Sequence, residues 1–136
     1  MIIDASAILA VLLDEPDART YADEISGAWP RRMSVIGFLE TAIVTESRGG
    51  ADAGIKFDAF LADASIEIVP VSLDQAYAAR DAWRRFGKGR HPACLNFGDC
   101  FAYALAKTSG EPLLFKGGDF PRTDIETVAF EPDSAP

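Results

Sequence analysis

Histidine and cysteine are almost absent from this chain. Its 136 residues include one histidine, His91, and two cysteines, Cys94 and Cys100. These side chains are too few for a zinc site with four histidine or cysteine ligands, and two cysteines do not make the disulfide framework of a small secreted domain. We expect both thiols to be reduced and packed. A metal site in this protein would have to rely on oxygen ligands.

Long apolar runs are absent too. No stretch approaches the roughly 20 apolar residues of a membrane-spanning helix. No positively charged leader precedes the first apolar stretch, which starts at Met1. We therefore expect a cytoplasmic protein that does not associate with membranes. The composition, 49% apolar and 25% charged, is ordinary for a folded chain, and its length fits one domain over residues 1–136, with 131–136 as a frayed tail.

Positive charge is scarce, because 13 lysines and arginines face 21 aspartates and glutamates, which gives a net charge of -8. This balance argues against nucleic-acid binding, since phosphate contacts need local positive charge. The charge is unevenly distributed, however. Segment 80–91 carries five basic side chains and one acidic one, a net +4, which leaves -12 for the rest of the chain.

A solvated helix face that pairs with acids would explain any single arginine of this segment. For the cluster as a whole we expect contact with a phosphate backbone, because it lies beside Asp99 in the sequence. The candidate substrate-binding residues are Arg80, Arg84, Arg85, Lys88 and Arg90.

Short apolar segments alternate with segments of helical periodicity along the chain. The pattern predicts strands at 2–3, around Met33, and at 66–69, 113–115 and 127–130, and helices at 7–13, 16–26, 35–48, 55–61, 73–86 and 99–108. We expect Ser6 to cap the first helix and Gly49 and Gly50 to end the third. Such alternation predicts an α/β fold, a three-layer α/β/α sandwich with a mostly parallel sheet of four to five short strands.

Four acidic residues stand at element boundaries or on an apolar helix face. Asp4 ends the first strand, Asp99 lies in the first turn of its helix, Asp119 follows the strand at 113–115, and Glu40 lies on the apolar face of the third helix. Taken alone, each of the three aspartates is explained equally well or better by capping, a helix dipole or a turn, and Glu40 by partial exposure. In a parallel sheet the strand ends collect along one edge, so the four can converge.

Carboxylates that gather closely repel one another unless a proton or a cation intervenes. Hard oxygen ligands without a histidine cluster suit Mg²⁺ or Mn²⁺ rather than zinc. A site of this kind can hydrolyse phosphate esters with the help of the metal.

Several blocks of the chain together resemble a PIN-domain ribonuclease of the VapC toxin group. They are residues 3–7, the helix with Glu40, residues 95–106 and residues 112–120. The resemblance implies a PIN-like fold and an Mg²⁺- or Mn²⁺-dependent endoribonuclease that hydrolyses phosphodiester bonds of RNA. It also implies the toxin component of a type II toxin–antitoxin system, inhibited by a cognate VapB-like antitoxin and usually a homodimer.

The same resemblance implies roles for individual residues. It carries metal-ligand roles onto Asp4 and Asp99, a further acidic role onto Glu40, a supporting role onto Asp119 and an ordering role onto Ser6. One difference concerns Gly118, because relatives often have aspartate or asparagine at that position. Asp124 could compensate, although an exposed turn residue is more often structural.

Two other functions remain open at this point. The first is a phosphatase with a strand-end aspartate, but the usual Asp-x-Asp pair of the haloacid-dehalogenase type has Ser6 at its second position here. The second is a binding module whose catalytic site is silent, which the retention of all four acids disfavours.

Overall fold

A parallel sheet of four short strands forms the centre of the computed structural model, which describes residues 1–129. The strands are β1 (Ile2–Ile3), β2 (Arg32–Ser34), β3 (Glu67–Val69) and β4 (Leu113–Leu114). Their order is β3-β2-β1-β4, and every neighbouring pair is parallel. Because the strands run in one direction, their carboxyl ends share one edge of the sheet.

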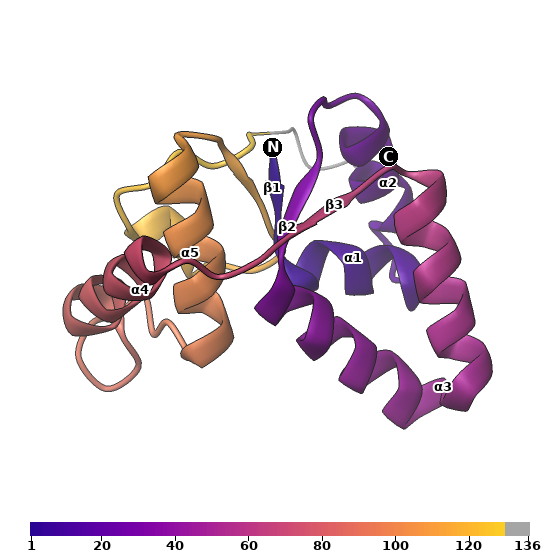
Figure 1. Ribbon diagram of the computed structural model, residues 1–136, viewed down its shortest axis with the longest axis horizontal. Helices are drawn as coiled ribbons and strands as arrows, with labels where there is room; N and C mark the ends of the chain where they lie inside the picture. Colours follow the sequence, from indigo (N-terminus) through magenta and orange to yellow (C-terminus); the bar gives the residue numbers. More distant parts are fainter. Residues whose placement is uncertain (130–136) are drawn as a thin grey trace.

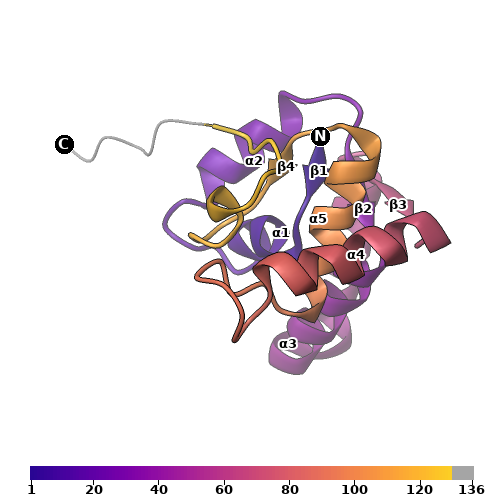
Figure 2. The same cartoon turned by 90° about the vertical axis from the view of Figure 1, so that its left-hand side faces the viewer.

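Helices cover both faces of this sheet. On one side lie α1 (Ala5–Leu12), α2 (Ala18–Ser26) and α3 (Val35–Asp63), and on the other lie α4 (Leu73–Phe86) and α5 (Phe97–Ser109) (Figure 1). Seen from the side of the second group, α4 crosses in front of α5 (Figure 2). A short 3-10 helix, η1 (Phe120–Arg122), follows β4. The predicted three-layer α/β/α fold is therefore confirmed.

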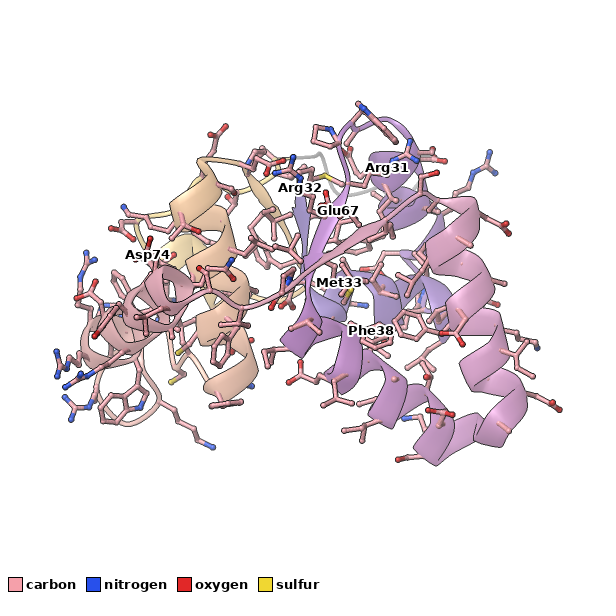
Figure 3. The ribbon with its side chains drawn as sticks, in the orientation of Figure 1. Arg31, Arg32, Met33, Phe38, Glu67 and Asp74 are labelled. Atoms are coloured by element: carbon pink, nitrogen blue, oxygen red, sulfur yellow. The ribbon has the colours of Figure 1, made fainter. Side chains whose placement is uncertain are left out.

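Successive side chains of a strand point alternately into the two hydrophobic cores, one on each face of the sheet. Ile2 and Leu113 are fully buried in the core beneath α4 and α5, whereas Ile3 and Leu114 are buried in the core beneath α1 and α3. Met33 belongs to the second core, and Figure 3 shows it beside Phe38 between the sheet and α3. This alternation follows from the two-residue period of a strand.

Ion pairs join the strands at their amino ends. Arg32 pairs with Glu67 at 3.2 Å and with Glu111 at 3.1 Å, and Glu111 also holds the amino group of Met1 at 2.9 Å. Arg32 and Glu67 lie near the top of the sheet in Figure 3, away from the strand ends that lead into α1 and α3. These ion pairs connect the strands at the amino edge of the sheet. The predicted acids lie instead beyond the opposite edge, where the strands end.

Local sequence signals predicted most helix boundaries. The predicted stop near residue 50 is confirmed, because Gly50 has φ 69° and ψ -161° and interrupts the helical path within α3. The Ser72 side chain accepts the Gln75 N–H at the start of α4, and α4 ends before Gly87 as predicted. Two helices begin two residues earlier than predicted, α1 because Asp4 caps it and α5 because Asn96 caps it.

The predicted strand at 127–130 is wrong over the residues that the structure describes. Thr127 forms only an isolated parallel bridge with Leu113. The N–H of Leu113 donates to the carbonyl of Glu126 at 3.0 Å, and the N–H of Val128 donates to Leu113 at 2.9 Å. One bridge does not extend into a ladder, so the sheet has four strands here. Residues 130–136 lie outside the described residues, so the frayed tail and the single-domain extent stay predictions.

Two further observations bear on the sequence predictions. Cys100 is buried, but Cys94 is exposed, so the prediction that both free thiols are packed holds for one of them. Within residues 1–129, none of the helices combines the length and the hydropathy that crossing a membrane requires.

Candidate active site

Asp4 is the most buried of the four predicted acids, with 7% of its surface exposed. It is the N-cap of α1, and its Oδ2 accepts the backbone N–H of Ser6 at 3.1 Å and the Ser6 hydroxyl at 2.5 Å. Burial raises the pKa of the Asp4 carboxyl above its ordinary value, against the opposing effect of these hydrogen bonds. The Oδ1 oxygen receives neither bond from Ser6.

Ser6 does not cap α1, contrary to the prediction, because Asp4 already occupies that position. Its hydroxyl oxygen instead accepts the backbone N–H of Lys116 at 2.9 Å, just after β4. The ammonium group of Lys116 contacts Glu15 and lies 2.9 Å from Asp17, in the segment between α1 and α2. Ser6 and Lys116 therefore connect Asp4 to the loop that carries Asp119.

Asp99 lies at the start of α5 in a reciprocal capping box. Its N–H donates to Asn96 Oδ1 at 2.9 Å, and its Oδ2 accepts the Asn96 N–H at 3.0 Å. The pKa of Asp99 is raised to about 6, first by partial burial and then by the negative charges of three other acids, against the Asn96 bond. Those acids are Asp4, Asp119 and Glu40. Asp99 is therefore near enough to interact with each of the other three predicted acids.

Glu40 is exposed at the edge of the sheet, which agrees with the partial exposure that the sequence left open and not with a position facing the core. Glu40 lies in the early turns of α3, and its side chain contacts the start of α5 rather than the core. The carboxylate lies against Gly98, and a Cβ at position 98 would collide with it. Partial burial and then the charge of Asp4 raise the pKa of the Glu40 carboxyl. Gly98 is thus a site residue that the sequence analysis missed, because nothing local showed what approaches it.

Asp119 is exposed and directly precedes η1. The neighbouring Gly118 has open space around it, since no atom lies within 4 Å of a Cβ built there. Asp124 is structural, as the sequence analysis favoured. It accepts the Tyr103 hydroxyl at 2.5 Å and pairs with Lys107 at 3.2 Å and Arg85 at 3.1 Å. Partial burial alone would raise the pKa of Asp124, but these bonds outweigh it and lower the pKa to about 2.

The acids supply only oxygen donors to this edge of the sheet. Among residues 1–129, no three histidine, cysteine, aspartate or glutamate side chains are grouped closely enough to hold a metal ion as they stand. Their mutual repulsion, which adds to burial in raising the pKa of Asp99, opposes a tighter grouping unless a cation neutralises them. This donor set fits a hard divalent cation, which prefers carboxylate oxygen.

The five predicted substrate-binding residues are all exposed, but they are not equivalent. Arg85 is engaged with Asp81 at 3.2 Å and with Asp124 at 3.1 Å, so it joins α4 to the segment after η1. The Arg90 guanidinium stacks over the Trp83 ring, 4.1 Å from its centroid. The side chains of the other three make no hydrogen bond or ion pair with residues 1–129, and two of them line a pocket between α4 and α5. They are Arg80 and Lys88, which line the pocket, and Arg84.

Comparisons with known proteins agree with this fold. The PIN domain family matches residues 1–126. Ribonuclease VapC30 of Mycobacterium tuberculosis is 54% identical over 129 residues, which cover 95% of this chain and 98% of that protein. Ribonuclease VapC of Mycolicibacterium smegmatis is 55% identical over 128 residues, which cover 94% and 99%.

A solved structure supports the fold independently. The crystal structure of VapBC2 from Rickettsia felis, bound to a DNA fragment from their promoter, contains a chain that superposes with a TM-score of 0.77. The two chains are 13% identical, and the match covers 96% of this chain and 98% of that one. The chain therefore belongs to the PIN-domain family, within the group of VapC toxin ribonucleases.

Proposed function

We propose that this VapC-family endoribonuclease hydrolyses RNA with the help of a divalent cation, Mg²⁺ or Mn²⁺, at the edge of the sheet that carries Asp4, Glu40, Asp99 and Asp119. The observation that carries the proposal is the proximity of four acids from different segments of the chain. Partial burial is the main cause of the raised pKa of Asp99, and the charges of the other three acids add to it. Carboxylates brought together in this way are the usual setting for a hard cation.

Each side chain has a separate task in this proposal. Asp4 and Asp99 hold the cation, Asp4 through the oxygen that Ser6 leaves unbonded, while Asp119 supports the site from the loop after β4. Ser6 orients Asp4 and anchors that loop through the Lys116 N–H. When bound, the cation supplies Lewis-acid activation of a water and neutralises phosphate charge.

Glu40 has a different position from the two proposed ligands. Its carboxylate is at the surface, is not engaged in any ion pair with the described residues, and has a raised pKa. A carboxylate of this kind can take a proton from an attacking water at one of its oxygens. Gly98 leaves the space in which this carboxylate lies.

Two solved structures of the same fold support a proposal about the partners. One is VapBC2 from Rickettsia felis bound to a DNA fragment from their promoter, and the other is a toxin–antitoxin complex from Klebsiella pneumoniae. We propose that this chain likewise binds a cognate VapB-like antitoxin, acts on RNA and forms a homodimer. The phosphatase and the silent binding module are not favoured, because the relatives are ribonucleases.

A cleavage assay tests this function. Antitoxin-free protein is incubated with a structured RNA in Mg²⁺, in Mn²⁺ and in EDTA, and products are resolved on a gel. We expect cleavage only with a divalent ion, and no cleavage by Asp4→Asn or Asp99→Asn. Asp58→Asn is the matched control, because Asp58 is an exposed aspartate on α3 away from the four acids. Unchanged cleavage in EDTA would contradict the proposal.

A further inference from the structure

An apolar pocket opens between α4 and α5, outside the acidic edge. It has a volume of about 530 Å³, within the usual range of small-molecule sites. Its apolar lining includes Trp83, Leu95, Phe97 and Phe101, and two cationic side chains, Arg80 and Lys88, also line it. The pocket thus combines flat aromatic surfaces with positive charge.

Two aromatic side chains of this pocket are open to solvent. Phe97 is 74% exposed and Trp83 is 45% exposed. Phe97 packs edge-on against Phe101 with ring centroids 5.0 Å apart, and Arg90 stacks on Trp83, so both exposed rings are held from one side. Exposed aromatic surface in a concave setting is typical of a binding site, since bases stack on such rings.

The positive charge around the pocket favours an anionic ligand. Arg80, Arg84 and Lys88 belong to the segment of net charge +4, whereas the rest of the chain carries -12. A polyanion is therefore repelled from most of the surface and attracted here. Single-stranded RNA has both features that the pocket matches, an aromatic base and a phosphate backbone.

The pocket and the acidic edge share the first turn of α5. Asn96 lines the pocket and caps Asp99, and Phe97 precedes Asp99 by two residues. At about 100° per residue, Phe97 and Phe101 lie on one face of α5 and Asp99 on the opposite face. An RNA strand that crosses this helix end can reach both places.

We propose that this pocket binds one unpaired base of the RNA substrate, close to the cleaved phosphodiester. Phe97 and Trp83 stack on the base, while Arg80 and Lys88 contact its phosphates. The proposal rests on the proposed ribonuclease function. Because stacking accepts any base, the pocket selects unpaired nucleotides rather than a sequence.

Trp83 provides a direct test. The chain has two tryptophans, so a Trp29→Phe background leaves Trp83 as the only one. A short single-stranded oligoribonucleotide is titrated in EDTA, and so is the same oligonucleotide with its bases removed. We expect the intact strand to quench Trp83 fluorescence and the abasic strand to quench it far less. Equal quenching by both strands, or no quenching by either, would overturn the proposal.

Two substitutions separate stacking from charge. Phe97→Ala should weaken binding about 5- to 150-fold, the effect of losing one base–aromatic stack. Arg80→Gln should weaken it with a smaller salt dependence. Ile55→Ala and Arg19→Gln are the matched controls, because both residues are exposed on other helices. If Phe97→Ala binds RNA like the control, the proposal fails.

The same variants distinguish the proposal from its alternatives. The oligomeric state is measured by light scattering, and antitoxin binding by titration. If Phe97→Ala breaks a dimer or loses only the antitoxin, while RNA binding is unchanged, the pocket is a protein interface and the proposal is overturned. Wild-type cleavage is assayed in parallel. Its absence with every divalent ion rejects the ribonuclease proposal, whereas normal cleavage and a normal KM in Phe97→Ala reject only the base pocket.

Discussion

The hydroxyl of Ser6 accepts the backbone N–H of Lys116 at 2.9 Å, although the two residues are 110 positions apart. The same hydroxyl donates to Asp4 at 2.5 Å. One oxygen thus joins the start of α1 to the loop after β4, which carries Asp119. This link sets the position of two acids of the candidate site relative to each other.

Replacing Ser6 tests this link. Ser6→Ala removes both hydroxyl bonds but keeps the backbone N–H that donates to Asp4, so α1 stays capped. We expect cleavage to fall about 10- to 100-fold, as for groups that orient metal ligands. The free energy of unfolding should fall by about 1 kcal/mol per lost bond. Single-turnover kinetics and urea denaturation measure the two effects, with Ser26→Ala as the control. Lower stability with undiminished cleavage would leave Ser6 only a structural role.

The Asp99 carboxylate should destabilise the folded protein in the absence of metal. Its pKa is about 6 in the folded chain, against an ordinary value of 3.8 for an aspartate carboxyl. The folded state therefore binds the proton more tightly, and stability is lost as the pH rises from about 4 to 6. Asp99→Asn should raise the free energy of unfolding above pH 6, by about 1 kcal/mol after allowance for solvent screening.

Urea denaturation in EDTA at pH 4 and pH 7.5 measures this effect. Asp99→Asn and wild type should differ more at pH 7.5 than at pH 4, and Asp58→Asn should show no such difference. A variant that is less stable than wild type at pH 7.5 would show that the Asn96 capping box outweighs the repulsion.

Metal affinity should depend on pH for the same reason. Protons and a divalent cation compete for Asp99, whose pKa is about 6 without metal. The apparent affinity for Mg²⁺ should be constant well above pH 6 and fall about tenfold per pH unit below it. Isothermal titration calorimetry between pH 5 and 8 measures this dependence. Affinity that does not change across this range would place the cation away from Asp99.

A methyl group at position 98 should affect activity without harming the fold. Gly98→Ala places a Cβ against the Glu40 carboxylate, which is the mobile end of its side chain and can move aside. Alanine also favours a helix over glycine by about 0.5–1 kcal/mol. We expect unchanged or higher thermal stability and cleavage reduced about 10- to 100-fold, because Glu40 is displaced. Gly118→Ala, where the added methyl meets open space, is the control. Full activity of Gly98→Ala would argue that Glu40 needs no fixed position.

The sequence predicted the bounds of helices well where a few neighbouring residues decide them. The break at Gly50 and the two ends of α4, at Leu73 and Phe86, each depend on a few neighbouring residues. The prediction failed where distant segments decide. Thr127 has strand-like neighbours, but it pairs with β4 only through one isolated bridge to Leu113, and whether a second pair forms depends on how the distant segments pack.

The candidate site shows the same division. The sequence by itself determined the chemistry of the donors, because a chain with one histidine and 21 carboxylates offers oxygen ligands at its strand ends. Only the tertiary structure decided that Glu40 lies against Gly98 instead of in the core, and that Ser6 reaches Lys116. It also decided that Trp83 and Phe97 line one pocket. Each of these contacts joins residues far apart in sequence, so it depends on how helices and strands pack, which no local pattern records.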